Sequence, residues 1–271
     1  MPNSLKYPIL LVHGMGFRDY KHIGYWGRIP KTFEQLGCKV FFGNQDSNAD
    51  IETNARFLAR RIDQILQETG AEKVNIIAHS KGGLDCRYAI SALNMSEKVA
   101  SLTTISSPHH GSKTVDKLLK CPRFLVRLGC FCTDCWFRIL GDKEPNTYRT
   151  IHSFTTTYAS EFNARVLDCE GVYYQSYAFA MKKPSSDIFL WLTNLVVGKV
   201  EGENDGLLTP NSAKWGDFKG VYYGAGRRGI SHCDEVDMRR RPLSKKTSDS
   251  GVSDIIEIYT DILYDLKNRC F

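Results

Sequence analysis

The sequence lacks the features that mark membrane-spanning, repetitive or multidomain proteins. No apolar run approaches the roughly 18 residues that a transmembrane helix needs. There is also no internal repeat, no low-complexity tract and no linker rich in Pro, Gly and Ser. Of the 271 residues, 42% are hydrophobic and 24% are charged, which is enough apolar material for one sizeable core. We therefore expect a single domain over residues 1–271 with no transmembrane segment.

The sequence also has only a small excess of positive charge. The 36 Lys and Arg residues outnumber the 30 Asp and Glu residues by six. This favours contact with an anionic surface but falls short of the clustered basic footprint of nucleic-acid-binding proteins, so we expect no nucleic-acid partner. The first residues, Met1 to Tyr7, lead into an apolar strand without the hydrophobic stretch of a signal peptide. The sequence as written predicts a cytoplasmic protein, or a secreted one if a leader has been removed.

The cysteines show no sign of a disulfide framework. There are nine, an odd number, and most are scattered, which is typical of reduced thiols. Four crowd into one short segment, as Cys121, Cys130, Cys132 and Cys135. Their spacing lacks the two well-separated C-x2-C pairs of common structural zinc sites, so Zn²⁺ is not expected. Cysteine also packs well as a small apolar residue.

Short apolar runs alternate with helical patterns along the chain. Continuous apolar runs predict buried strands at residues 8–12, 39–42, 73–78 and 101–105, with further strands at 172–179 and 219–223. Apolar residues at helical spacing predict helices over 50–69, about 80–93 and 252–266. This alternation predicts an α/β fold, with a mostly parallel central sheet and helices on both faces. Ligands of such sheets gather beyond the carboxyl ends of the strands, so residues 13–14, 79–80 and 106–108 are expected on one rim.

The alternation stops between Ser112 and Thr150. Within residues 113–150, apolar side chains recur at helical spacing among lysines and arginines. Such a basic, amphipathic insertion above the rim has two interpretations: a lid that opens at a lipid–water interface, or a fixed cap packed on the body. Both remain open at this point.

A candidate nucleophile lies between the third predicted strand and its helix. The segment Ala78-His79-Ser80-Lys81-Gly82-Gly83 is close to the Gly-x-Ser-x-Gly turn that exposes a serine above a sheet, with alanine in the first position. Small residues are needed two positions before and after the serine because the turn brings them against neighbouring backbone. An ordinary glycine-containing loop with a surface serine is the alternative reading.

A second glycine-rich turn follows the first strand. His13-Gly14-Met15-Gly16 ends where a backbone N–H can reach the same point as the start of the helix after Ser80. An acyl-transfer enzyme must stabilise an oxyanion, and we assign that role to the backbone N–H groups of Met15 and Lys81. The alternative is that these glycines serve only a tight turn.

A general base and an acid complete the candidate site. In serine hydrolases with this strand–turn–helix nucleophile, the acid and then the histidine follow the serine along the chain. His232 is the only histidine after residue 152. Asp205, in a polar Asn-Asp-Gly turn, is our choice for the acid that orients it, with Glu203 and Asp187 in reserve.

The combination of these motifs resembles the bacterial triacylglycerol lipases of the α/β-hydrolase fold, most of all the Pseudomonas and Burkholderia type. The matching segments are residues 11–16, 25–27, 78–83, 107–112, 204–207 and 232–236, in the right order over nearly the whole chain. The resemblance implies an α/β-hydrolase fold, Ser80, Asp205 and His232 as a catalytic triad, and Met15 and Lys81 as oxyanion-hole donors.

The resemblance also implies a structural calcium ion near the catalytic histidine. In those lipases Ca²⁺ is bound by an aspartate two residues after the histidine, by another shortly before the catalytic acid, and by backbone carbonyl groups. Asp234 matches the first position, and Asp187 lies close to the second. Solvated acidic residues in a polar loop are the alternative reading.

Together these features predict a serine carboxylic ester hydrolase, a lipase or esterase, that works through an acyl-enzyme and needs no cofactor for its chemistry. Its expected partner is an ester or lipid substrate, including one at a lipid–water interface. Two rival functions remain: an acyltransferase or thioesterase using the same triad, and a non-catalytic binding protein with a hydrolase-like fold.

Overall fold

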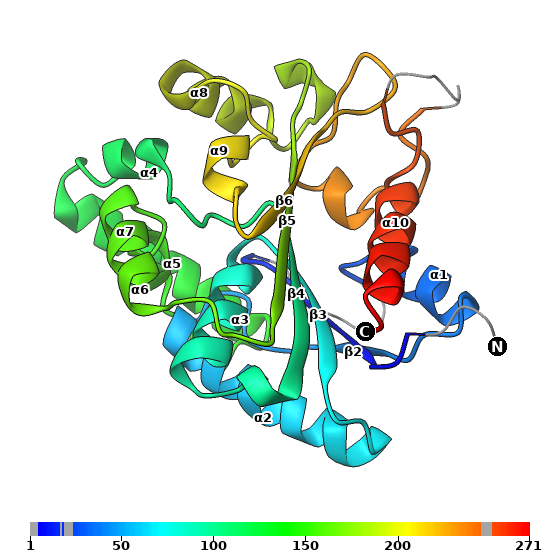
Figure 1. Ribbon diagram of the computed structural model, residues 1–271. Coiled ribbons are helices and arrows are strands. Elements are labelled where there is room, and N and C mark those ends of the chain that lie inside the picture. The colour runs from blue at the N-terminus through cyan, green and yellow to red at the C-terminus, as the bar shows by residue number, and fades with distance from the viewer. Residues whose placement is uncertain (1–4, 17, 19–23, 245–250) are drawn as a thin grey trace.

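A six-stranded sheet forms the centre of the computed structural model, which describes residues 5–16, 18, 24–244 and 251–271 (Figure 1). Its strands lie in the order β2-β1-β3-β4-β5-β6, and every neighbouring pair is parallel. They are β1 (Ile9–Val12), β2 (Val40–Phe42), β3 (Val74–His79), β4 (Val99–Ile105), β5 (Tyr173–Phe179) and β6 (Asp217–Tyr222). The six predicted strands are confirmed, with ends that differ by a few residues.

Ten α-helices of the described part of the chain connect and cover these strands. They are α1 (Ile29–Gln35), α2 (Ile51–Thr69), α3 (Lys81–Ala92), α4 (Lys113–Leu118), α5 (Arg123–Ile139), α6 (Thr147–His152), α7 (Thr156–Arg165), α8 (Trp191–Glu201), α9 (Pro210–Ala213) and α10 (Ile255–Asn268). Short 3-10 turns lie at Ser96–Lys98, Pro184–Ser186 and Asp234–Val236. The helices predicted after the second and third strands and at the C-terminus are confirmed.

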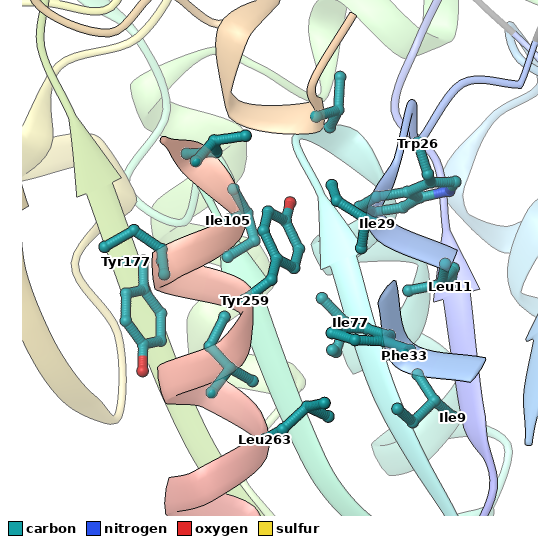
Figure 2. Packing of buried hydrophobic residues seen from close by; sticks show 14 of the residues in the cluster. Ile9, Leu11, Trp26, Ile29, Phe33, Ile77, Ile105, Tyr177, Tyr259 and Leu263 are labelled. Atoms are coloured by element: carbon teal, nitrogen blue, oxygen red, sulfur yellow. The ribbon is translucent and has the colours of Figure 1, made fainter. Parts of the chain in front are cut away.

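The sheet has a separate apolar core on each face. Alternate residues of a strand point to opposite faces, so Ile9 and Leu11 of β1 pack with α1 and α10, while Leu10 and Val12 pack with α2 and α3. Figure 2 shows the first of these cores, where Trp26 and helices α1 and α10 cover the strands. Because both faces are covered, β1 is apolar throughout, whereas β6 at the edge of the sheet is only partly buried and carries Asp217 and Lys219.

The carboxyl ends of the central strands meet on one rim, as predicted. Ser80 follows β3, and its backbone N–H donates to the carbonyl oxygen of Ile105 at the end of β4, at 2.9 Å. A Cβ atom added to Gly14, after β1, would lie only 2.7 Å from the Cβ of Ser80. Segments far apart in the sequence therefore converge at this rim.

Residues 113–150 form α4, α5 and the first part of α6. The apolar side of α5 faces outward: Phe124, Leu128, Phe131 and Ile139 are between 58% and 78% exposed, whereas Cys130 on the opposite side is buried. In the parts of the chain that the structure describes, no helix is long and apolar enough to cross a membrane. The start of the chain, on which the expectation about a signal peptide rests, lies partly outside the described residues.

Candidate active site

Ser80 occupies a strained turn between β3 and α3. Its backbone has φ 55° and ψ −130°, in the region of positive φ that residues with a Cβ rarely adopt. Strain of this kind persists only where the surroundings hold it, and it raises the serine side chain above the sheet at the amino end of α3. The predicted nucleophile turn thus has the geometry that its chemistry requires.

The small residues around Ser80 are needed for close packing. A Cβ atom on Gly82 would lie 2.5 Å from the carbonyl oxygen of His13 and 2.9 Å from that of Val12. A real Cβ does not approach backbone oxygens so closely, so the turn after β1 and the start of α3 can be this near only with glycine at position 82.

His232 and Asp205 form a buried pair. The His232 Nδ1 and the Asp205 Oδ2 atoms lie 2.8 Å apart, and the His232 backbone N–H donates to the Asp205 carbonyl oxygen at 2.9 Å. The second carboxylate oxygen of Asp205 accepts from the N–H groups of Leu207 and Leu208. Burial would raise the pKa of Asp205, but His232 and these two N–H groups outweigh it and lower that pKa. Asp205 is therefore an ionised carboxylate that fixes the imidazole.

A cavity of about 420 Å³ brings this pair to the nucleophile, because Ser80, His232 and Met15 all line it. Most of its wall is apolar and includes Val115, Leu118, Ile151, Phe154, Leu190 and Leu207. A mostly apolar pocket with a few polar groups at one place is the usual form of a small-molecule site.

The two predicted oxyanion donors belong to segments that meet at Ser80. Met15 belongs to the turn packed against Ser80 through Gly14, and Lys81 is the first residue of α3. The N–H groups of a first helical turn point out of the helix, toward a developing negative charge. The Lys81 side chain takes no part, since its Nζ is buried and donates to both Asp85 oxygens at 2.6 and 2.8 Å.

A second buried chain of polar side chains, which the sequence patterns did not predict, runs beside the Asp205–His232 pair. The Gly14 N–H donates to the Tyr25 hydroxyl, which lies 2.6 Å from His79 Nδ1. His79 Nε2 lies 3.1 Å from Glu235 Oε2, and that oxygen is 3.6 Å from His232 Nδ1. The chain therefore links the turn before Met15 to His232, the candidate base. A sequence signal for this chain is the carboxyl group of Glu235, three residues after His232.

The pKa shifts of His79 and Glu235 both favour the neutral form. Burial, reinforced by nearby His232 and His13, places the pKa of His79 well below its usual range. Burial, reinforced by nearby Asp205, places the pKa of Glu235 well above its usual range. Donor atoms of His79, His232 and Glu235 lie within 4.8 Å of one another, a spacing that suits a metal ion. A metal at His232 Nδ1 would displace Asp205, so we interpret the cluster as a hydrogen-bonded network.

Glu235→Gln is expected to keep activity within about 10-fold of wild type at neutral pH, because glutamine resembles the neutral carboxyl group. The raised pKa means that the folded protein binds a proton that the unfolded chain releases above its ordinary pKa of 4.5. This contribution to stability is present at low pH and is lost as the pH rises toward the folded-state value. The melting temperature of Glu235→Gln relative to wild type should therefore be higher at pH 8 than at pH 5. If the difference in melting temperature between Glu235→Gln and wild type were the same at both pH values, Glu235 would not be a carboxyl group with a raised pKa.

The other predicted residues lie outside the triad. Glu203 is exposed and accepts from the Tyr223 hydroxyl, so it does not serve as the acid. Asp187 accepts from the hydroxyl of Ser231 at 2.7 Å, so its partner is the residue before His232 and not His232 itself. Asp234 follows His232 and faces Arg239, with 2.6 Å between its Oδ1 and the arginine Nε.

The four clustered cysteines are free thiols in different surroundings. Cys130 is buried, Cys135 is half-buried, and Cys121 and Cys132 are exposed. Within the described residues, they do not gather into a group that could ligate a metal. The helical spacing of α5 separates Cys130 from Cys132 because residues two apart point to different sides of a helix.

The sequence of this protein matches a known family and several named proteins. A model of the palmitoyl protein thioesterase family matches residues 8–223. Triacylglycerol lipase 2 of Saccharomyces cerevisiae is 28% identical over 267 residues, covering 94% of this chain and 77% of that protein. A triacylglycerol lipase of Burkholderia plantarii is 39% identical over 118 residues, covering 42% of this chain and 32% of the lipase.

Solved structures agree at the level of the fold. The mature lipase BlEst2 of Bacillus licheniformis superposes with a TM-score of 0.68 at 21% identity, covering 97% of this chain and 93% of that one. The Staphylococcus hyicus lipase gives a TM-score of 0.69 at 16% identity, covering 99% and 98%. The predicted resemblance to bacterial triacylglycerol lipases and the predicted α/β-hydrolase fold are confirmed. With a match over most of its length, the chain belongs to the palmitoyl protein thioesterase family.

Proposed function

We propose that this protein is a serine carboxylic ester hydrolase of the lipase and esterase type, which cleaves acyl esters through an acyl-enzyme. The observation that carries the proposal is that Ser80 and the Asp205-paired His232 line the same apolar cavity. The yeast and bacterial relatives named triacylglycerol lipase support the same reaction class.

The proposed reaction needs only side chains and backbone groups of this chain. Ser80 Oγ attacks the ester carbonyl carbon while His232 Nε2 accepts its proton, and Asp205 stabilises the imidazolium that results. The N–H groups of Met15 and Lys81 hold the negative oxygen of the tetrahedral intermediate. His232 then gives the proton to the departing alkoxide, which leaves as the alcohol. Water attacks the acyl-enzyme by the same route and releases the acid.

The apolar cavity indicates an acyl chain as the part of the substrate that is bound. Val115 and Leu118 of α4 and Leu190 before α8 line the cavity beside Ser80, so an acyl chain can remain out of water while its carbonyl is at the nucleophile. Each methylene group buried there contributes roughly 0.8 kcal/mol. We therefore expect kcat/KM to rise with acyl length until the cavity is filled.

A thioesterase is the second candidate, favoured by the family match over residues 8–223. The same triad can attack a thioester carbonyl, and the leaving group is then a thiol instead of an alcohol. Paired oxygen and sulfur esters of equal acyl length, compared by kcat/KM over a chain-length series, test both candidates. Higher values for the oxygen esters support an ester hydrolase, and higher values for the thioesters support the second candidate. Absence of turnover on every member would contradict both.

Activity is expected to increase when a soluble ester passes into aggregates, because the outward apolar side of α5 favours a lipid–water interface. α5 provides none of the described residues that line the cavity. Phe131→Ser should therefore reduce turnover of aggregated ester and leave that of dissolved short-chain ester unchanged. Rates measured across the solubility limit check this. A curve that saturates smoothly below that limit would contradict a lid or interface role for residues 113–150.

A further inference from the structure

The two aspartates expected to bind calcium are already held by side chains of this protein. Asp187 and Asp234 are both buried, and the Arg239 guanidinium lies between them. Arg239 Nε is 2.6 Å from Asp234 Oδ1, and Arg239 Nη2 is 3.5 Å from Asp187 Oδ2. The same Nη2 donates to the Ser186 carbonyl oxygen at 3.0 Å.

The remaining carboxylate oxygens are also used. Asp187 Oδ1 accepts from the Phe189 N–H at 2.9 Å, and Asp234 Oδ2 accepts from the Ser231 N–H at 3.2 Å. Ca²⁺ requires six to eight oxygen ligands, roughly 2.3–2.6 Å away. In the part of the chain that the structure describes, no third acidic or histidine side chain joins the two aspartates in a metal-ligating group. Because a guanidinium cation already lies against both carboxylates, these residues do not fit calcium.

Arg239 lies where the resemblance to lipases implied a calcium ion. Both carboxylates hold Ser231, the residue before His232: Asp187 accepts from its hydroxyl at 2.7 Å, and Asp234 accepts from its backbone N–H at 3.2 Å. Two buried carboxylates this close together repel each other unless a positive charge lies between them. Arg239 supplies that charge, and Arg228 adds a second positive charge that acts on both aspartates.

We propose that the Arg239 guanidinium is a built-in cation that holds Asp187 and Asp234 together and so positions the loop of His232. Arg239 is thus a positioning residue, and the protein needs no bound calcium for its activity. The proposal rests on the proposed role of His232 as the base. An arginine suits this place because its planar group carries several donors in a fixed arrangement and stays charged at any ordinary pH.

The first test compares wild type in a chelator and in added CaCl₂, using a soluble nitrophenyl ester. We expect kcat/KM to change by less than about 2-fold in either, because no metal is to be removed or bound. Loss of activity in the chelator that calcium restores would overturn the proposal. Wild-type turnover and its dependence on Ser80 are measured in the same assay, so a failure of the proposed function is distinguished from a failure of this inference.

The second test uses variants of Arg239. Arg239→Gln should lower kcat by about 10- to 100-fold with little change in KM, since a shift of the base affects the chemical step more than binding. Arg239→Lys should retain an intermediate kcat, because one ammonium group keeps the charge but not the fork of donors. The matched control, Arg241→Gln, removes an exposed arginine two residues away and should behave as wild type.

Chemical rescue separates positioning from a general loss of folding. Added guanidinium ion should raise the kcat of Arg239→Ala, whereas urea at the same low concentration should not, because urea has the shape of guanidinium without its charge. If Arg239→Gln fails to fold, Arg239→Lys and the chelator test still show whether Arg239 takes the place of a metal ion. Wild-type kcat in Arg239→Gln, or equal effects of guanidinium and urea, would overturn the proposal.

Discussion

Ser80→Ala is expected to lower kcat on an acyl ester by about 10⁴-fold or more, because the change removes the hydroxyl group that forms the acyl-enzyme. The change removes one oxygen from a half-buried side chain, so the melting temperature should stay close to that of wild type. A loss of less than about 10-fold is far too small for removal of a nucleophile and would contradict the triad.

A covalent probe checks the same residue independently of the substrate. A fluorophosphonate should label the wild-type protein once per chain, with the added mass on the peptide that contains Ser80. Ser112→Ala is a matched control, since Ser112 also lines the cavity but follows β4 at the start of α4. It should label as wild type, whereas Ser80→Ala should not label at all. Failure of the wild type to label would favour a non-catalytic binding protein.

Asp205→Asn is expected to lower kcat by about 10⁴-fold while leaving KM and the fold nearly unchanged, on the scale known for triads of this kind. Asparagine keeps the shape, but its amide group favours the wrong His232 tautomer and does not stabilise the imidazolium. Steady-state kinetics, with circular dichroism for folding, check the result.

The control for this change is Asp217→Asn on β6, whose carboxylate is exposed and pairs with Lys219. It removes one negative charge away from the cavity and should change kcat by less than about 2-fold, since exposed ion pairs contribute little. If Asp205→Asn behaved like this control, Asp205 would not be the acid that His232 needs.

Local sequence patterns were sufficient to predict the fold and the candidate nucleophile. Strands buried on both faces are rich in apolar residues, and helices that cover them carry one apolar stripe, so the alternation of the two predicted the parallel sheet. Ser80 was found because its turn needs small neighbours in known positions. Helix α1 was not predicted, although Ile29-Pro30 is a typical helix start. Helix α8 was not predicted either, because it carries apolar residues on its exposed sides and so shows no single apolar stripe.

Contacts between distant segments were beyond the reach of these patterns. His232 and Asp205 could be chosen from their order along the chain, because that order accompanies a known turn. The role of Glu235 could not, since its raised pKa depends on burial beside Asp205, and burial is a property of the folded protein.

The sequence by itself determined the parallel sheet, the serine turn and the reaction class, because each depends on local patterns and on the order in which they follow one another along the chain. Only the tertiary structure decided what happens to charges that meet across the molecule. It placed Arg239 between Asp187 and Asp234 where a metal ion was expected, and it turned the apolar side of α5 outward. The physical reason is that the energy of a charge or an apolar surface depends on what lies beside it in space, and spacing along the chain does not specify those neighbours.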